Sequence, residues 1–227
     1  MKTLAFIPAR GGSRGIKNKN LIKINKKPLI KYTIDLVKKF KILDIFISSD
    51  SKKIINYCKN LGVEIHYKRP VKLSNSKTSM YKTVKHGLDW LKKRGKTYDN
   101  ILLLQPTNPL RNKEDLQKIL KLSKKKSLSS LASVTKIREH PSETIFLKNK
   151  KKEFLLKSKK KLTRRQDFDK NYYFIDGTYY LFKEDFFKKN KNFVSIKKTY
   201  FYKLKNTWPI DIDTKDDAKV AANFLND

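Results

Sequence analysis

The residues best suited to chemistry lie near the two ends of the chain. Residues 7–20, IPARGGSRGIKNKN, place three glycines among arginines and lysines directly after an apolar run. Glycine permits backbone conformations with positive φ, in which successive N–H groups point into one concavity and hold an anion. Near the other end, IDID places Asp211 and Asp213 two residues apart, so both carboxylates face the same side of an extended segment. The first pattern predicts a phosphate site and the second predicts Mg²⁺, which prefers carboxylate and phosphate oxygens.

Each pattern also has a simpler interpretation. The glycine segment matches neither GxGxxG nor GxxxxGK[ST], so a tight turn carrying surface charge is the alternative. Thr214 and Asp217 have the spacing of a capping box, so Asp213 or Thr214 could merely begin the last helix. Capping gives no reason for Asp211, and the metal interpretation is favoured on that ground.

A third candidate is the polar segment QPTNPLRN at residues 105–112. It follows the most apolar run of the chain, and its two prolines stiffen it. Side chains such as Gln105, Thr107 and Arg111 would then be held at the mouth of a cleft. The same segment could be a plain entry into a helix with Asn112 as its cap, and both interpretations stay open.

Short apolar runs alternate with amphipathic stretches through the first half of the chain. Strands are predicted at 3–8, 44–49, 63–67 and 100–105, and helices at 28–40, 51–62 and 78–93. This alternation is typical of βαβ units, so we expect an α/β fold with a Rossmann-like, doubly wound, mainly parallel sheet. Ligands of such sheets bind beyond the C-terminal ends of the strands. The segments after residues 8, 49, 67 and 105 are therefore expected to share one cleft.

The second half of the chain is less regular. Strand-like pieces at 130–136 and 144–148 surround a polar stretch, a strong strand is predicted at 173–182, and WPIDID reads as a strand that enters a final helix. No internal repeat or flexible linker is visible. We therefore expect residues 1–227 to form a single domain with an excursion.

Composition limits the classes of protein further. The 227 residues include no apolar run of membrane length, and the beginning of the chain lacks the features of a signal peptide, so a cytoplasmic protein without a membrane partner is expected. The single cysteine, Cys58, reads as a packed helix position. The formal net charge of +34 comes mainly from lysines spread over every segment, as in proteins from A/T-rich genomes. The densest run, at 148–165, is interpreted as solvated surface; a non-catalytic, basic nucleic-acid-binding protein is the alternative class.

Several of these segments together resemble the CMP-N-acylneuraminate synthetases, the cytidylyltransferases that activate sialic acid and related nine-carbon sugar acids. The similar segments, in the family's order along the whole chain, are IPARGGSRGIKNKN, KRP (68–70), TSMYKTVKHGL, LLQPTNPLR, DGTYYL and IDIDTKDDAK. The resemblance implies the fold of nucleotide-diphospho-sugar transferases. It also implies transfer of CMP from CTP to the anomeric hydroxyl of a nonulosonic acid, with release of pyrophosphate and with Mg²⁺ as cofactor.

The resemblance assigns roles by position, and the residues fall into four groups. Those implied to cradle the triphosphate are Arg10, Ser13, Arg14, Lys19 and Asn20. Those implied to hold the cytidine are Arg69, Thr78 and Ser79. Those implied on the sugar side are Gln105, Arg165, Asp176 and Phe193. Gln105 and Thr107 are also implied to bind the nucleotide, and they would lie between nucleotide and sugar. Those implied to bind Mg²⁺ are Asp211 and Asp213, which with Arg10 and Lys19 form the expected catalytic set.

The same resemblance implies a homodimer. Residues 137–171 correspond to a protruding dimerisation element, and Phe193 would reach the neighbouring subunit's site. Two departures fall on the sugar side: Asp176 stands where the family commonly has Asn, and Glu143 stands where sialate-specific members can carry lysine. The sugar is therefore left open among N-acetylneuraminate, legionaminic acid, pseudaminic acid and the eight-carbon acid KDO. A water bound to Asp213 or to Mg²⁺ is the hypothetical proton acceptor.

Overall fold

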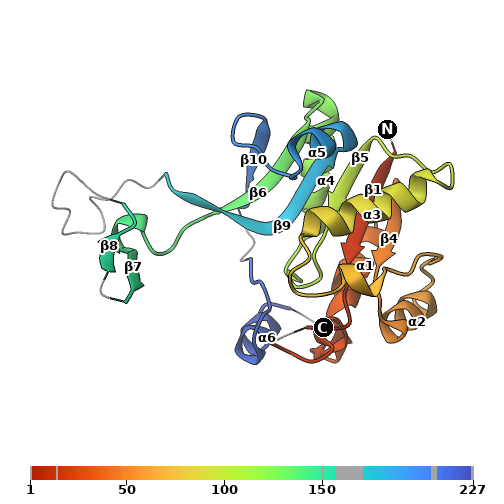
Figure 1. Ribbon diagram of the computed structural model, residues 1–227, viewed down its shortest axis with the longest axis horizontal. Helices are drawn as coiled ribbons and strands as arrows, with labels where there is room; N and C mark the ends of the chain where they lie inside the picture. Colours follow the sequence, from red (N-terminus) through yellow and green to blue (C-terminus); the bar gives the residue numbers. More distant parts are fainter. Residues whose placement is uncertain (1, 14, 150, 157–170, 206–208, 226–227) are drawn as a thin grey trace.

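The computed structural model describes residues 2–13, 15–149, 151–156, 171–205 and 209–225 (Figure 1). Its centre is a six-stranded sheet with the order β10-β6-β9-β5-β1-β4. The strands are β1 (Thr3–Pro8), β4 (Leu43–Ser48), β5 (Asn100–Leu103), β6 (Ser130–Lys136), β9 (Tyr173–Lys183) and β10 (Thr199–Lys203). β1 is parallel to β4 and β5, β6 is parallel to β10, and β9 is antiparallel to β5 and β6. The sheet is thus mostly parallel, as predicted.

Helices cover both faces of this sheet. They are α1 (Leu29–Lys38), α2 (Lys52–Asn60), α3 (Met80–Lys92), α4 (Lys113–Lys126) and α5 (Glu184–Asn190), whereas α6 (Lys215–Ala222) packs in a separate small core. On β1, Ala5 and Ile7 pack in one core with α1, α2 and α4, whereas Leu4 and Phe6 pack in another with α3 and α5. All six residues of β1 are buried, which is the pattern of a central strand covered on both sides. The doubly wound prediction is confirmed.

Local sequence accounts for where several helices begin. The side chains of Ser51, Ser79, Asn112 and Thr214 accept a backbone N–H from the first turn of α2, α3, α4 and α6, respectively. At α6, Asp217 completes a capping box with Thr214. Such caps satisfy N–H groups that have no partner within the helix. The expected helix-entry role of Asn112 and the expected capping box at Thr214 are therefore both present.

Two predicted strands are extended segments outside the sheet. Residues 63–67 pair with no strand among the described residues, although Val63, Ile65 and Tyr67 are buried and the residues between them are exposed. Residues 210–213 likewise form no strand, while Ile210 and Ile212 are buried and Asp211 and Asp213 are exposed. The alternation correctly predicted which side chains point inward. The same alternation does not indicate whether a partner strand lies at hydrogen-bonding distance.

Small elements complete the fold. β2 (Lys23–Ile24) and β3 (Lys27–Pro28) form one hairpin, and β7 (Ile145–Lys148) and β8 (Lys151–Phe154) form another. The β7–β8 hairpin lies far from the body of the molecule, beyond the ends of β6 and β9 (Figure 1). It occupies the middle of the predicted excursion at 137–171, part of which lies outside the described residues. Within the described residues, no helix combines the length and the apolar character needed to cross a membrane.

Candidate active site

One cavity of about 260 Å³ gathers most of the predicted site residues. It lies beyond the C-terminal ends of β1 and β5, where the expected cleft was placed. The predicted residues that line it are Arg10, Ser13, Lys19, Asn20, Arg69, Thr78, Gln105, Thr107, Asp211 and Asp213. Segments from both ends of the chain therefore meet in one place, which a plain surface turn does not require.

Two glycines of the first loop, Gly11 and Gly15, serve close packing, whereas a Cβ on Gly12 would meet no atom within 4 Å. Neither Gly11, Gly12 nor Gly15 has a φ in the left-handed region, so that part of the prediction is wrong. A Cβ on Gly11 would lie 2.9 Å from Cβ of Ser51, and a Cβ on Gly15 would lie 2.5 Å from the carbonyl oxygen of Asp213. Side chains at these two positions would therefore push the loop away from α2 and from the acidic segment.

The loop is held by polar contacts along its length. The amide of Gly11 donates to Oδ1 of Asp50 at 3.0 Å, and Nδ2 of the buried Asn20 donates to the carbonyl of Arg10 at 3.0 Å. Ile16 packs with Ile212 in a small core that also includes part of α6. The loop is thus fastened to the end of β4, to itself and to the acidic segment. Asn20 lines the cavity while its amide closes the loop.

Arg69 approaches the cavity from the segment after residue 67. Only 4% of this residue is exposed, and its guanidinium donates to the hydroxyl oxygen of Ser48 at 2.9 Å and to the Ser48 carbonyl. Burial lowers the pKa of Arg69, and Arg10 lowers it as well, while Tyr67 and Asp50 act in the opposite direction. The end of β4 therefore orients a buried cation toward the cavity.

Arg111 organises the 105–112 loop, a role that the sequence did not reveal. Its guanidinium donates to the carbonyls of Gln105 at 2.9 Å and Thr178 at 2.8 Å, to the Asn108 carbonyl, and to Oγ1 of Thr33 at 3.2 Å. Burial lowers the pKa of Arg111 to about 10, so the group stays protonated at neutral pH. Arg111 thus ties the loop that carries Gln105 and Thr107 to both α1 and β9.

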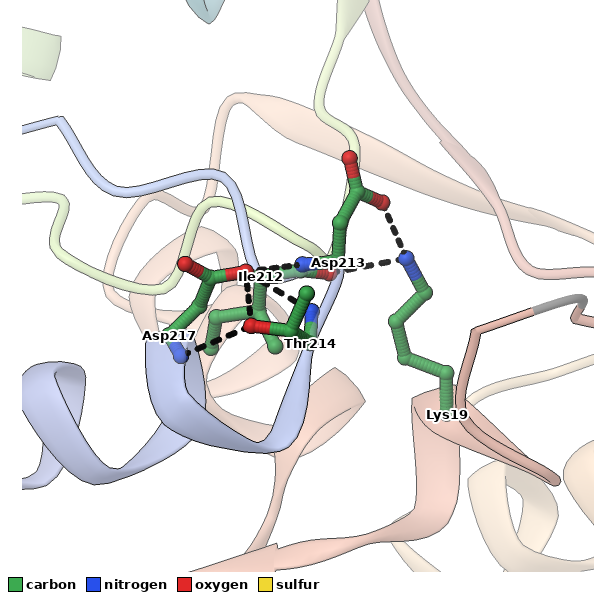
Figure 2. A network of polar contacts seen from close by, with 5 residues as sticks. All are labelled: Lys19, Ile212, Asp213, Thr214 and Asp217. Atoms are coloured by element: carbon green, nitrogen blue, oxygen red, sulfur yellow. Dashed lines mark hydrogen bonds and ion pairs between the residues drawn. The ribbon is translucent and has the colours of Figure 1, made fainter.

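The acidic segment forms a polar network with the first loop (Figure 2). Nζ of Lys19 lies 2.6 Å from Oδ1 of Asp213 and 2.8 Å from the carbonyl oxygen of Ile212. Oδ2 of Asp217 accepts the amides of Asp213 and Thr214 at 3.0 and 2.7 Å. On the other side, the Ile212 amide donates to the carbonyl of Thr107 at 2.8 Å. The backbone at 212–214 is therefore fixed from two directions.

The donor set fits a divalent cation that is shared with a phosphate ligand. Asp211 and Asp213 both line the cavity and are exposed, and the side chain of Asp213 is 74% exposed despite its contact with Lys19. Among the described residues, no group of three or more His, Cys, Asp or Glu side chains could hold a metal alone. Mg²⁺ is commonly bound by one or two carboxylates together with substrate phosphates and water, and two carboxylates in a cationic cavity suit that mode.

Of the residues predicted on the sugar side, Gln105 lines this cavity, whereas Asp176 and Phe193 do not. Asp176 is 7% exposed, and its carboxylate accepts the hydroxyls of Ser133 and Thr135, at 2.5 and 2.8 Å, and the amide of Thr178 at 2.8 Å. It holds an irregularity between β6 and β9 and does not line the cavity. Phe193 packs against aromatic rings of its own chain, with ring centroids 5.2 Å from Tyr180 and 5.8 Å from Phe182.

Of three further predicted residues, one lies beside the cavity and two lie outside the described residues. Ser79 caps α3, and its hydroxyl accepts the Lys82 amide at 3.3 Å; it is absent from the cavity lining, next to Thr78, which is present. Arg14 and Arg165 lie outside the described residues. Their predicted contacts with the triphosphate and with the sugar therefore stay predictions.

The sequence reasoning also missed part of the cavity wall. The segment after KRP and the beginning of α3 contribute the additional residues Leu73, Asn75, Ser76, Met80 and Thr83. Their position in the chain could have predicted this role, because they follow a buried extended segment in a doubly wound fold, where ligand-binding loops occur. The segment shows no strand-like or glycine-rich pattern, so its composition alone does not indicate that it lines a binding cavity.

The fold and the cavity together define a class. A mostly parallel, doubly wound sheet with a cationic cavity beyond the C-terminal ends of its strands is a Rossmann-like fold with its ligand site at the expected edge. Solved structures agree: that of a CMP:2-keto-3-deoxy-manno-octonic acid synthetase complexed with CTP superimposes with a TM-score of 0.70 at 16% identity, covering 99% of this chain and 100% of the other. A 4-diphosphocytidyl-2C-methyl-D-erythritol synthase from Anaerococcus prevotii superimposes with a TM-score of 0.64 at 16% identity, covering 98% and 97%.

The family follows from the sequence. The sequence model of the cytidylyltransferase family matches residues 4–222, and the chain belongs to that family. It is 30% identical to a pseudaminic acid cytidylyltransferase of Campylobacter jejuni over 97% of this chain and 95% of the relative. It is 31% identical to a CMP-N,N'-diacetyllegionaminic acid synthase of the same species over 98% and 94%.

A third relative is longer. The chain is 29% identical to an N-acylneuraminate cytidylyltransferase of Streptococcus agalactiae over 96% of this chain and 52% of the relative. The chain thus spans about half the length of that protein.

Proposed function

We propose that this chain transfers CMP from CTP to the anomeric hydroxyl of a nonulosonic acid and releases pyrophosphate. The observation that carries the proposal is the single cavity in which the cations of the first loop, Arg69 and the pair Asp211 and Asp213 come together. Relatives that are about 30% identical over nearly the whole chain are named for this chemistry on sialic, pseudaminic and legionaminic acids. The resemblance of the separate motifs supports the same reaction.

The protein groups suit a transfer at the α-phosphorus. In-line displacement is accelerated mainly by positioning the reactants and by neutralising phosphate charge. Arg10 and Lys19 from the first loop and Arg69 from the segment after residue 67 all line the cavity, so cations from two segments border the place of the proposed triphosphate. Gln105 and Thr107 lie on the loop held by Arg111 and would separate the nucleotide from the sugar.

The proposed cofactor is Mg²⁺, held by Asp211 and Asp213. When bound, it would neutralise charge on the transferring phosphate. The proposal for these two residues rests on their exposure to the cavity and on the fixed backbone between Ile212 and Thr214. Their exchange for alanine should lower activity most strongly at limiting Mg²⁺. Full activity of both variants under that condition would remove the metal assignment.

The proposed location of the reaction is the cytoplasm, where CTP is available. The sugar is proposed as a nonulosonic acid without a choice among sialic, legionaminic and pseudaminic acids, since relatives of each kind are similarly distant. KDO is the fourth candidate, because the fold of a CTP-bound synthetase for that acid superimposes along the whole chain.

We further propose a homodimer built on the β7–β8 hairpin. Ile145, Phe146, Leu147 and Phe154 of this hairpin are between 43% and 62% exposed, and Phe174 at the base of β9 is 46% exposed. A two-stranded hairpin is marginal in water by itself, and a concentration of exposed apolar side chains marks an interaction surface. A second copy of the same hairpin is the proposed partner.

One experiment tests the reaction and selects the sugar. The chain is incubated with CTP and Mg²⁺ and, in turn, with N-acetylneuraminic, legionaminic and pseudaminic acids and KDO, while pyrophosphate release is followed. Release with at least one acid and formation of the matching CMP-sugar are expected. Absence of release with every acid, together with tight and salt-sensitive binding of DNA or RNA, would instead favour a nucleic-acid-binding protein.

A further inference from the structure

Lys19 neutralises one of the two carboxylates proposed to bind the metal. Its Nζ contacts Oδ1 of Asp213 at 2.6 Å and the carbonyl oxygen of Ile212 at 2.8 Å (Figure 2). The two residues are 194 positions apart in the sequence, so only the fold brings them together. The Lys19 side chain is 12% exposed, whereas that of Asp213 is 74% exposed. A largely enclosed ammonium thus reaches out to an open carboxylate.

This contact opposes a second cation at Asp213. A divalent ion on the other oxygen of that carboxylate would lie close to the ammonium, and like charges at such separations repel strongly in a partly buried site. Asp213 also has only one negative charge to share between the two cations. Binding of a metal to the free chain is therefore weakened for as long as Lys19 stays in place.

The backbone at Asp213 has little freedom to escape the contact. Its amide is bonded to Asp217, its carbonyl oxygen packs against Gly15, and the preceding amide of Ile212 is bonded to Thr107. Lys19, by contrast, has four rotatable methylene groups and an ammonium that can turn to other acceptors. The lysine side chain can therefore leave Asp213 without any shift of the backbone at 212–214.

The cavity offers a place to which Lys19 can turn. Lys19 lines it together with the cations Arg10 and Arg69 and with Ser13, a set of donors suited to phosphates. A triphosphate there presents several anionic oxygens, each a stronger partner for an ammonium than the Ile212 carbonyl. The same phosphates would supply the remaining ligands of a cation held by Asp211 and Asp213.

We propose that Lys19 is a built-in counter-ion that holds Asp213 until nucleotide arrives. Nucleotide phosphates draw the ammonium away, and the released carboxylate then binds the cation. The proposal rests on the proposed use of a nucleotide and a divalent ion in this cavity. Its consequence is that the free chain binds divalent cations weakly and that removal of the Lys19 charge increases this affinity.

The test measures Mn²⁺ binding to the free chain, without nucleotide or sugar, by electron paramagnetic resonance of unbound Mn²⁺. Lys19→Met removes the charge at similar length, and Lys19→Gln removes it but keeps a donor for the Ile212 carbonyl. Lys17→Met is the matched control, since Lys17 is an exposed lysine of the same loop and does not line the cavity. Both Lys19 variants are expected to bind Mn²⁺ about tenfold more tightly than the unchanged chain, a difference of about 1.4 kcal/mol.

The expected increase in Mn²⁺ affinity of the Lys19 variants must depend on Asp213. Adding Asp213→Asn to either Lys19 variant should return Mn²⁺ affinity to the level of Asp213→Asn alone. Lys17→Met removes the same net charge elsewhere on the loop, and it should leave the Mn²⁺ affinity unchanged. Equal Mn²⁺ affinity in the unchanged chain and both folded Lys19 variants would overturn the proposal, as would a gain that survives Asp213→Asn.

The outcome is separable from that of the reaction assay. CMP transfer with unchanged Mn²⁺ affinity in the Lys19 variants would leave the proposed function standing and remove the counter-ion role. No transfer with any sugar, together with an Asp213-dependent gain in Mn²⁺ affinity, would remove the proposed function and retain the competition between Lys19 and the cation.

Discussion

Gly15 packs directly against Asp213: a Cβ at position 15 would lie 2.5 Å from the Asp213 carbonyl oxygen. Real Cβ atoms do not approach backbone oxygen so closely. The proposed phosphate loop and the proposed metal segment therefore touch through backbone at this point. The contact explains a glycine that shows no special φ.

Gly15→Ala is expected to separate these two segments. The added methyl group must displace either the loop or the backbone of Asp213, and a shift near 1 Å at reacting groups can lower rates by about a hundredfold. We expect kcat/KM for CTP to fall by about tenfold or more. Gly12→Ala is the matched control, since a Cβ there meets no atom within 4 Å. Equal activity of the two variants would contradict the importance of the contact.

Removal of the Arg111 guanidinium should destabilise the protein. In Arg111→Met, the carbonyls of Gln105, Asn108 and Thr178 lose a buried donor. Each unpaired buried group costs about 1–3 kcal/mol, so the free energy of unfolding should fall by at least about 2 kcal/mol. The measurement is urea unfolding followed by circular dichroism. Arg94→Met, which removes an exposed guanidinium 3.7 Å from the Trp90 ring, should cost less than about 1 kcal/mol.

Asp176→Asn should affect stability and not sugar preference. The carboxylate accepts three hydrogen bonds in the interior. In the variant, the NH₂ group of asparagine would face one of these three donors and could not accept its hydrogen bond. A loss of about 1–3 kcal/mol in the free energy of unfolding is expected. The ratio of kcat/KM values between two accepted sugars should stay constant. A change of about tenfold in that ratio would place Asp176 in contact with the sugar.

Cys58 should make unfolding more favourable at alkaline pH. Burial raises the pKa of the Cys58 thiol from 9.0 to about 12. Above pH 9 the unfolded chain therefore loses this proton while the folded chain keeps it, so the associated stability is complete below pH 9 and falls as pH rises.

The comparison variant for this effect is Cys58→Ala. Between pH 8 and pH 10, the unchanged chain should lose about 1.4 kcal/mol more unfolding free energy than the variant does. Urea unfolding at both pH values gives the difference, and titration of lysines and tyrosines is common to the two proteins. If the free energy of unfolding fell equally in the two proteins, the pKa of the folded Cys58 thiol would not be raised.

Charges on the β7–β8 hairpin should dissociate the proposed dimer. Phe146→Asp combined with Phe154→Asp places carboxylates on its exposed apolar surface, where burial against a second copy would be costly. Sedimentation velocity should show the unchanged chain as a dimer and the double variant as a monomer. Ile42→Asp, at an apolar residue that is 68% exposed between α1 and β4, should remain dimeric. A monomeric unchanged chain at micromolar concentration would contradict the proposal.

Local patterns in the sequence predicted the elements of this fold well. Apolar spacing placed α1, α2 and α3, and the alternation at 210–213 showed that Asp211 and Asp213 would face away from the core. These predictions succeeded because the periodicity of side chains within one element directly records which face is buried. The strand at 63–67 was wrong because pairing depends on a second segment whose position the pattern does not contain.

Only the tertiary structure decided how the parts of the site depend on one another. The sequence brought Lys19, Gly15, Asp211 and Asp213 to attention as separate signals, and it left Arg111 without a distinct role. Their relations are contacts between distant parts of the chain, such as the ion pair between Lys19 and Asp213, which are 194 residues apart. Such contacts arise from the packing of whole elements, so no short stretch of sequence determines them. The sequence therefore determined which groups are present at the site, and the fold decided which of them hold one another in place.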